Sequence, residues 1–403
     1  MSKLVIYATG ILLLISSARA QMPPPVIPHG VGVNIHFVTG NEKDLDLIAA
    51  GGFKFIRMDF SWEETEPKAG AYDWSSYDEL SEHLARRGLR AIFILDYVNS
   101  AYEPMVEARR AVGEPSPEQH IASPRHPESV AAFARWAAAA ARHFRGRGVI
   151  WEIYNEPNGG FWRPKPDAAE YSTMALATAK ALKEAEPDAT LIAPALSAFD
   201  FKFLEPFLAS GVLEYLDGVS VHPYRQPTKP PETAARGFKE IREMINRYAP
   251  ESRRGKIAII SGEWGYSSNR KGVSLETQAD FAVRQQLANL LNGVPLSIWY
   301  DWKNDGADPD YNEDNFGVVY SDLRPKPAYN AVREMTRALD GFEFKERVDG
   351  FGPKDYVLLF AKPDGTKKIA AWTLLEPHTI MIERWKPGVS LELRSRPQYV
   401  SVK

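Results

Sequence analysis

Two glutamates, each set in a short apolar run, are the residues of this sequence best suited to chemistry. Glu156 lies within Trp151–Pro157, and Glu263 lies within Ile260–Trp264. Both runs are rich in residues typical of strands, and each stops at a carboxylic acid among small or polar residues. Cleavage of a glycosidic bond needs two such groups, one protonated to donate to the leaving oxygen and one ionised to attack the sugar. The pair therefore indicates glycoside hydrolysis.

Apolar runs of this kind recur eight times, with amphipathic stretches between them. The runs are Val31–Phe37, Phe55–Trp62, Ala91–Val98, Val149–Tyr154, Leu191–Leu196, Val219–Tyr224, Ile257–Gly262 and Leu296–Trp302. Helices are expected at Tyr77–Arg87, Pro127–Phe144, Asp167–Ala185, Ala234–Tyr248, Leu275–Leu291 and Ser321–Thr336. Eight strand–helix repeats predict an α/β fold of the (β/α)8 (TIM) barrel type. A doubly wound open sheet is the alternative, but the first run lacks the Gly-rich phosphate loop typical of it.

The pattern changes near residue 337 to short alternating strands joined by turns. Tyr356–Ala361 and Lys368–Thr373 flank a Pro-Asp-Gly turn, and Thr379–Arg384 and Val389–Leu393 follow. We therefore expect a signal peptide at residues 1–20, a proline-rich leader at 21–29, the catalytic barrel at 30–336 and a small antiparallel, β-sandwich-like domain at 337–403. No flexible linker precedes the last domain, which favours a structural partner of the barrel over a separate sugar-binding module.

The first twenty residues have the pattern of an export signal. Lys3 precedes the apolar run Ile11–Ile15, and Ala18–Ala20 offers a cleavage site. The run is shorter than the roughly 20 residues that span a bilayer, which disfavours a membrane anchor. We expect a secreted or periplasmic protein that begins near Gln21, with no membrane contact after cleavage.

Composition narrows the classes of partner and chemistry. The 403 residues include no cysteine, which excludes disulfides and thiolate catalysis. The 49 basic and 52 acidic residues give a net charge of −3, so nothing favours nucleic acid as a partner. We expect a monomer that binds a polysaccharide or an oligosaccharide.

Other polar and aromatic residues stand near predicted strand ends, where barrels place their catalytic groups. His36 ends the first strand, Arg57 lies late in the second, and Asp96 ends the third. Asn155 precedes Glu156, His222 and Tyr224 end the sixth strand, and Trp302 ends the eighth. Any one of them could instead serve a salt bridge, a helix cap or the core. Together they predict one site at the barrel mouth.

These residues resemble the signature of the retaining glycoside hydrolases of clan A, which are (β/α)8 barrels, and families 5 (cellulase-like) and 39 are the most similar. Asn155–Pro157 and Glu263 carry the resemblance, which spans roughly Gly30 to Thr336. Further similar segments are Trp62–Pro67, Gly70–Trp74, Tyr300–Gly306, Asn315–Gly317 and Pro325–Tyr329.

The resemblance implies roles for the site residues. Glu156 would be the general acid/base, Glu263 the nucleophile, and Asn155 the partner of the sugar 2-hydroxyl. Arg57 and Tyr224 would favour the ionised form of Glu263. A histidine at the position of His222 lines the site in the family, with a core histidine as the alternative. Trp302 would be the aromatic floor under the sugar, unless it is a core residue or exchanges roles with Trp299.

One position departs from the family pattern. Many cellulase-like members carry a histidine near the end of the third strand, where this chain has Asp96 and Tyr97. We expect His36 to compensate in part. The departure concerns the sub-family and the substrate rather than the mechanism.

No metal or cofactor is expected. The acidic run of Asp305, Asp308, Asp310, Glu313 and Asp314 lacks the spacing of a calcium loop, and the histidines form no zinc-ligand pair.

We predict a retaining β-glycosidase. The long loops Asn99–Pro127 and Tyr224–Pro231 favour endo action on a polysaccharide. An exo-acting glycosidase on oligosaccharides, a transglycosylase and a carbohydrate-binding barrel that does not catalyse are the alternatives.

Overall fold

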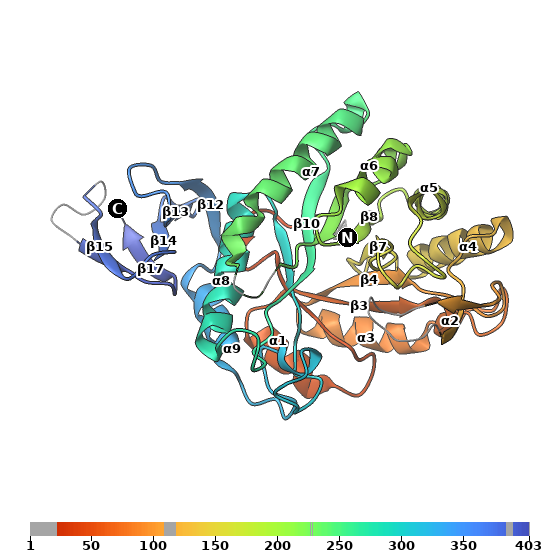
Figure 1. The fold of residues 1–403 in the computed structure, drawn as a ribbon, viewed down its shortest axis with the longest axis horizontal. Coiled ribbons are helices and arrows are strands. Elements are labelled where there is room, and N and C mark those ends of the chain that lie inside the picture. Colours follow the sequence, from red (N-terminus) through yellow and green to blue (C-terminus); the bar gives the residue numbers. More distant parts are fainter. Residues whose placement is uncertain (1–21, 109–117, 226, 228, 384–389, 403) are drawn as a thin grey trace, which may run out of the picture.

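The computed structural model describes residues 22–108, 118–225, 227, 229–383 and 390–402, so the predicted signal peptide lies outside the described residues. Eight parallel strands close into a barrel in the order β10-β11-β2-β3-β4-β7-β8-β9 (Figure 1). They are β2 (Val31–Asn34), β3 (Phe55–Ser61), β4 (Arg90–Asp96), β7 (Ile150–Ile153), β8 (Thr190–Ser197), β9 (Gly218–His222), β10 (Ala258–Trp264) and β11 (Leu296–Trp299). Each coincides with one predicted run, which confirms the (β/α)8 barrel.

Helices surround the barrel. They are α1 (Glu42–Ala50), α2 (Trp62–Thr65), α3 (Ser75–Arg86), α4 (Pro127–His143), α5 (Ala168–Ala185), α6 (Phe201–Ala209), α7 (Ala235–Tyr248), α8 (Leu275–Leu291) and α9 (Pro327–Ala338), with short 3-10 turns at Val212–Glu214, Pro231–Ala234, Glu251–Arg253 and Glu313–Asn315. A further hairpin, β5 (Met105–Ala108) with β6 (Glu118–Ile121), follows β4. The last helix begins at Pro327 rather than at the predicted Ser321. Pro325 and Pro327 keep the residues before them out of the helical conformation, and proline is favoured at the first helical position.

Side chains along the barrel interior change from apolar to polar towards the mouth. Seven buried residues form one apolar cluster in the barrel interior: Phe55, Ile92, Ile150, Ile192, Ile260, Leu296 and Ile298. Because side chains alternate along a strand, Arg57 and Asp59 point to the same side of β3 as Phe55. By the same alternation, Glu152 points to the same side of β7 as Ile150. In the barrel interior the charged side chains therefore lie nearer the mouth than the apolar cluster does.

A five-stranded antiparallel sheet covers one side of the barrel, with strand order β1-β12-β13-β14-β17. Its strands are β1 (Val26–Ile27), β12 (Phe342–Arg347), β13 (Asp355–Ala361), β14 (Lys367–Thr373) and β17 (Gln398–Val402). A second sheet pairs β15 (His378–Met381) with β16 (Ser390–Leu393). These sheets confirm the small C-terminal β domain. Residues 384–389, into which two predicted strands extended, lie outside the described residues.

The proline-rich leader contributes to this sheet, because Val26 and Ile27 pair with Glu343 and Phe342 of β12. The leader is therefore a strand of the C-terminal sheet over part of its length.

Hydrogen bonds to a buried ion pair of the barrel, Arg284 with Glu232, join the β domain to the barrel. Arg284 of α8 donates from Nε and Nη2 to the two carboxylate oxygens of Glu232, each across 2.8 Å. Trp372 of β14 donates to the same carboxylate across 2.7 Å, and Arg284 also reaches the Ser395 hydroxyl at 3.0 Å. In Figure 1 the helices α8 and α9 lie between the barrel and these strands.

Within the described ranges, no helix is both long and apolar enough to cross a membrane.

Candidate active site

The two predicted catalytic glutamates meet at the barrel mouth. One carboxylate oxygen of Glu156 and one of Glu263 lie within 4.8 Å of each other and of a ring nitrogen of His222. Retaining glycosidases hold their carboxyl groups about 5–5.5 Å apart, whereas inverting enzymes need about 6.5–9.5 Å to admit a water. The spacing therefore fits a direct attack by one carboxylate on the sugar.

Arg57 lies at the centre of the site, and its side chain is buried. Its Nε donates to Glu152 across 2.6 Å, and Nη1 donates to Glu263 across 2.9 Å. Nη2 donates to the side-chain oxygen of Asn155 across 2.8 Å. A guanidinium is always charged, and its planar fork holds several acceptors in fixed directions. Arg57 thus orients Glu263 and Asn155 together, as the sequence predicted for Glu263.

His222 occupies one defined tautomer. Its Nε2 lies 3.1 Å from Nη2 of Arg57, which can only donate, so Nε2 is an acceptor and Nδ1 carries the hydrogen. Nδ1 then donates to Oε1 of Glu156 across 2.8 Å. Burial lowers the pKa of His222 to about 4, so the ring is neutral when it makes these bonds. His222 therefore positions the acid/base.

The environments of the two carboxyls separate their roles. Burial raises the pKa of Glu156 to about 7, against a hydrogen bond from Ser197 and the charge of Arg57. Burial also raises the pKa of Glu263, but Glu263 accepts from Arg57 and, across 2.8 Å, from the Tyr224 hydroxyl. Two donors, one permanently charged, make Glu263 the carboxyl that keeps its negative charge. Glu156 is accordingly suited to carry the proton.

The backbone around Glu156 is held in an unusual conformation. Tyr154 and Glu156 have φ values of 64° and 43°, in the left-handed region that ordinary residues rarely occupy. Such conformations persist only where the surrounding structure enforces them, and they cluster at active sites. Gly262, before the second glutamate, leaves room for its neighbours, since a Cβ there would lie 2.3 Å from the Ser220 hydroxyl.

Two predicted binding residues lie behind the site instead of lining it. Trp302 is 1 % exposed, and its indole N–H donates to Asp44 across 2.9 Å, so it offers no ring face to a sugar. Trp299 is buried in the same way. Asp96 is 0 % exposed and lies under the mouth of the barrel. These positions correct the expectations that Trp302 is the aromatic floor and that Asp96 meets the substrate directly.

Neighbouring residues take the exposed positions. Tyr300, two residues before Trp302, is half-buried, and its ring packs edge-on against Phe316 and His36. Tyr97, next to Asp96, is half-buried and stacks on Phe161 with ring centres 5.3 Å apart. Aromatic rings with an accessible face suit the apolar faces of sugars. Tyr300 and Tyr97 are therefore more accessible than the predicted Trp302 and Asp96, which lie two and one positions away.

His36 stands at the mouth and is paired with an acid. Its side chain is 47 % exposed, and Nε2 lies 3.3 Å from Oδ2 of the buried Asp301. Burial alone would lower the pKa of His36, but Asp301, Asp305 and Asp59 raise it to about 9. His36 is therefore a cation at neutral pH.

Two groups in the described part of the chain bring three metal-type ligand atoms within 4.8 Å: Glu156, His222 and Glu263, and His36, Asp301 and Asp305. In the first, both His222 nitrogens already have partners, and the Arg57 guanidinium lies 2.9 Å from Glu263. In the second, protonated His36 is engaged with Asp301. Ion pairs and hydrogen bonds suit both groups better than a metal ion does.

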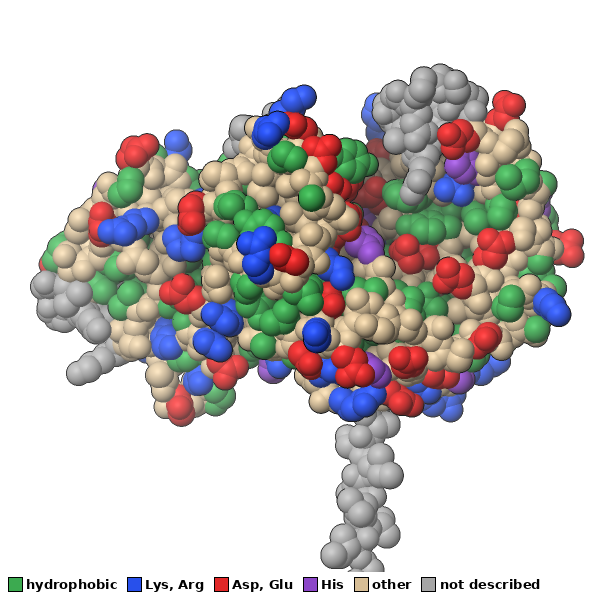
Figure 2. Space-filling view, turned by 90° about the horizontal axis from the view of Figure 1, so that it is seen from below, with side chains coloured by type: hydrophobic (Ala, Val, Ile, Leu, Met, Phe, Trp, Pro, Cys, Tyr) green, Lys and Arg blue, Asp and Glu red, His purple; other side chains and the backbone are tan. Residues whose placement is uncertain are grey.

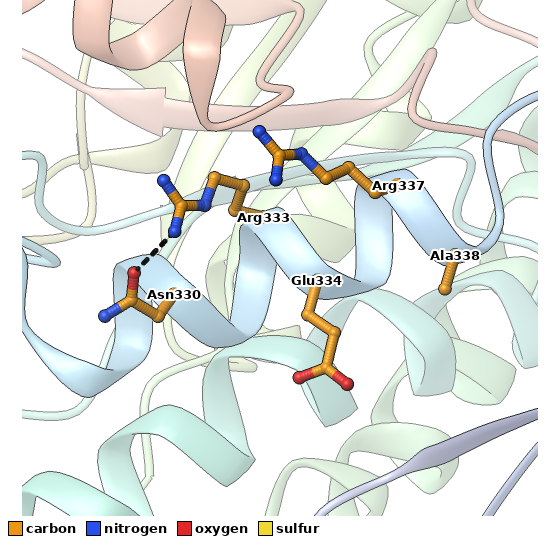
Figure 3. Close-up of a pocket in the computed structure, with 5 residues that line it drawn as sticks. All are labelled: Asn330, Arg333, Glu334, Arg337 and Ala338. Carbon is orange, nitrogen blue, oxygen red and sulfur yellow. Dashed lines mark hydrogen bonds between the residues drawn. The ribbon is translucent and has the colours of Figure 1, made fainter.

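The surface offers more than one hollow. Figure 2 shows a deep hollow in this face of the molecule, with acidic side chains and a histidine inside it. A second hollow, along α9, is lined by Asn330, Arg333, Glu334, Arg337 and Ala338 (Figure 3). It contains one carboxylate, and Arg333 donates to Asn330 across 3.2 Å. With a single carboxyl group it cannot perform a two-carboxylate reaction.

Comparisons with known proteins agree with this geometry. A family model described as cellulase (glycosyl hydrolase family 5) matches residues 27–306. No curated protein matches the chain in sequence. A solved family 39 glycoside hydrolase from the gut symbiont Bacteroides cellulosilyticus WH2 is 25 % identical with a TM-score of 0.76, and the match covers 95 % of this chain and 82 % of that one.

Two further solved structures share the fold at lower identity. A monomeric β-xylosidase from Caulobacter crescentus CB15 is 18 % identical, with a TM-score of 0.63, over 89 % of this chain and 76 % of that one. The exo-β-1,4-mannosidase Op5Man5 from Opitutaceae bacterium strain TAV5 is 17 % identical, with a TM-score of 0.55, over 80 % of this chain and 61 % of that one.

Proposed function

The chain belongs to glycosyl hydrolase family 5, and from this membership we propose that it is a retaining β-glycosidase in which Glu263 is the nucleophile and Glu156 the acid/base. The observation that carries the proposal is the approach of the two carboxylates to within 4.8 Å, with charged and neutral donors distributed unequally between them. A family 5 member is a glycoside hydrolase, so its substrate is a carbohydrate.

The reaction would proceed in two displacements. Protonated Glu156 donates to the leaving oxygen while a carboxylate oxygen of Glu263 attacks the anomeric carbon and forms a glycosyl ester. Arg57 and Tyr224 hold Glu263 towards that carbon. Esterification removes the negative charge of Glu263, which lowers the pKa of Glu156. Glu156 then takes a proton from a water that attacks the anomeric carbon on the face from which the leaving group departed, opposite Glu263. The ester bond to Glu263 breaks, and the sugar is released with its configuration retained.

Asn155 is placed to stabilise the transition state. Its side-chain oxygen accepts from Arg57, so its amide nitrogen faces away from the guanidinium. One amide hydrogen is hydrogen-bonded to the Tyr97 hydroxyl, and the other can donate to the sugar 2-hydroxyl. Hydrogen bonds to that hydroxyl strengthen as the sugar approaches the oxocarbenium ion. Arg57 thereby orients both the nucleophile and this donor.

We propose endo action on a polysaccharide as the first mode, because the loops that follow β4 and β9 are long. The exo mode has its own support, since two structures of the same fold are a β-xylosidase and an exo-β-1,4-mannosidase. Endo action would shorten a polymer quickly while releasing few reducing ends. Exo action would release monosaccharide from the start and leave the polymer viscosity almost unchanged.

We also propose that the protein is exported after cleavage before Gln21 and acts as a monomer. The support is the export-signal pattern of residues 1–20. N-terminal sequencing of protein from the periplasm or medium, with light scattering for mass, tests both points. An uncleaved N-terminus would contradict the first and a dimer mass the second.

The function is tested by incubating the protein from Gln21 onward with a panel of neutral β-linked polysaccharides and oligosaccharides. Glu263→Ala serves as the inactive control. Product release by the native protein alone establishes hydrolysis, and mass spectrometry of the products distinguishes endo from exo action. Equal release by both proteins would overturn the assignment of Glu263.

A further inference from the structure

Asp59 is an exposed carboxylate inside the barrel mouth that the reaction described above does not use. It lies two residues after Arg57 on the inward side of β3, and it is exposed while its neighbours Met58 and Phe60 are buried. An inward-facing residue can be exposed only through the open end of the barrel. Its side chain therefore faces the space that the substrate must enter.

The buried Asp96 is a direct neighbour of Asp59. Asp96 is 0 % exposed, and neither of its carboxylate oxygens has a donor among the described residues. Burial, together with the charge of Asp59, raises the pKa of Asp96 well above its usual range and so favours its protonated form. The O–H of that form can donate to the neighbouring Asp59. This hydrogen bond would hold the Asp59 side chain in place at the mouth.

The exposed acids lie where a glycone needs partners. Glu156 and Glu263 stand on β7 and β10, and between them the barrel runs in one direction through β11, β2, β3 and β4. Asp59 and His36 occupy that arc, and Asp301 follows β11 beside His36. The other direction leads through β9 and β8, where His222 is completely buried and Tyr224 and Ser197 are half-buried. The exposed charged groups His36, Asp59 and Asp305 thus lie on the arc that carries Asp59.

The charge of this arc selects among sugars. Asp59, Asp301 and Asp305 lie near the cation His36, whose pKa they jointly raise, and Lys303 also lies near Asp305. A sugar hydroxyl placed here can donate to a carboxylate, which is a charge-assisted bond. A uronic acid would bring a further negative charge among these carboxylates and would be repelled.

We propose that Asp59 is a specificity-determining residue that accepts hydrogen bonds from hydroxyls of an uncharged glycone and excludes anionic sugars. The inference rests on the proposed function, because it places the glycone at the Glu156–Glu263 pair. It assigns Asp96 as a positioning residue that acts through Asp59.

Binding is the test, because it does not depend on turnover. Glu156→Gln protein is titrated with neutral β-linked trisaccharides and with the matching uronic acid trisaccharide, alone and combined with Asp59→Asn. We expect neutral sugars to bind, the uronic acid to bind at least about tenfold more weakly, and Asp59→Asn to weaken neutral binding about tenfold to hundredfold. Asp59→Asn should also narrow the difference between neutral and acidic sugars.

Two controls make the result specific. Asp46→Asn removes an exposed carboxylate on the outside of α1 and should leave both affinities unchanged. Asp96→Asn keeps an N–H donor under Asp59 and should weaken neutral binding less than about threefold, whereas Asp96→Leu should approach Asp59→Asn. Thermal unfolding of each variant confirms that it is folded.

The possible outcomes are distinguishable from failure of the proposed function. Absence of neutral-sugar binding, equal binding of uronic acid, or unchanged affinity in Asp59→Asn would overturn the role of Asp59, even in an active glycosidase. Normal selectivity without hydrolysis by the native protein would instead support Asp59 and refute the catalytic proposal.

Discussion

The Nδ1 atom of His222 lies 2.8 Å from Oε1 of Glu156 and donates its hydrogen to that oxygen. Oε1 is therefore occupied as an acceptor, and in the proposed mechanism Oε2 would be the oxygen that carries the catalytic proton. Arg57 maintains this arrangement, since its contact with Nε2 excludes the other tautomer. One histidine thus determines which oxygen of the acid faces the substrate.

Replacing His222 with phenylalanine should shift the pH dependence as well as slow the reaction. The lost N–H bond favoured the ionised form of Glu156, so its pKa should rise above about 7 and the alkaline limb of kcat/KM should move to higher pH. Loss of orientation should lower kcat on the order of tenfold. A lower rate with an unmoved alkaline limb would mean that His222 only fills space.

The native enzyme should show a bell-shaped pH profile of kcat/KM. Activity should fall as pH rises through about 7, because Glu156 must be protonated in the free enzyme. It should also fall at acidic pH, at a midpoint above 4.5, because burial raises the pKa of Glu263, which must be ionised. The two limbs belong to the coupled pair. A rate that keeps rising above pH 8 would contradict the role of Glu156 as acid.

Azide should rescue the two glutamate variants with opposite stereochemistry. In Glu263→Ala, azide occupies the place of the nucleophile and should yield the α-glycosyl azide from an activated β-glycoside. In Glu156→Ala, azide attacks the glycosyl-enzyme and should yield the β-glycosyl azide. Both variants should lose at least about a thousandfold in kcat on substrates with poor leaving groups. Exchanged products would reverse the two roles.

The barrel and the approach of Glu156 to Glu263 at its mouth were predictable. Parallel strands buried on both faces read as apolar runs, and a carboxylate at the end of such a run stands out. Which residues face the barrel mouth could not be predicted in the same way. Whether Trp302 or Tyr300 faces the mouth depends on how the chain turns after β11, and the bond from Trp302 to Asp44 of α1 decides it. No pattern in the sequence around Trp302 predicts that contact, because Asp44 is distant along the chain.

The inward orientation of Asp59 could have been predicted from the alternation of side chains along the strand. Asp59 is separated from Arg57 by one residue and therefore shares its face, which the sequence alone indicates. Asp96, on the next strand, is buried by the packing around it. Strand alternation alone does not predict that burial. The pairing of Val26 with Glu343 was hidden for a similar reason, since it joins segments from opposite ends of the chain.

The β domain should unfold together with the barrel, because Trp372 and Ser395 of the β domain are hydrogen-bonded to the buried Arg284–Glu232 ion pair of the barrel. Arg284→Met would leave the Glu232 carboxylate without its cation and should lower the free energy of unfolding by about 3–5 kcal/mol. Arg284→Met with Glu232→Gln should recover much of this loss, since glutamine is neutral and still accepts from Trp372. Calorimetry should show one transition for all three proteins. Separate transitions in the native protein would identify an independent module.

The most direct test of the central claim is the configuration of the first product. A substrate identified in the hydrolysis panel is cleaved in an NMR tube, and the anomeric signals are followed before mutarotation. Attack by Glu263 followed by water predicts the β-anomer first and the α-anomer later. Initial appearance of the α-anomer would show inversion and would contradict a covalent intermediate on Glu263.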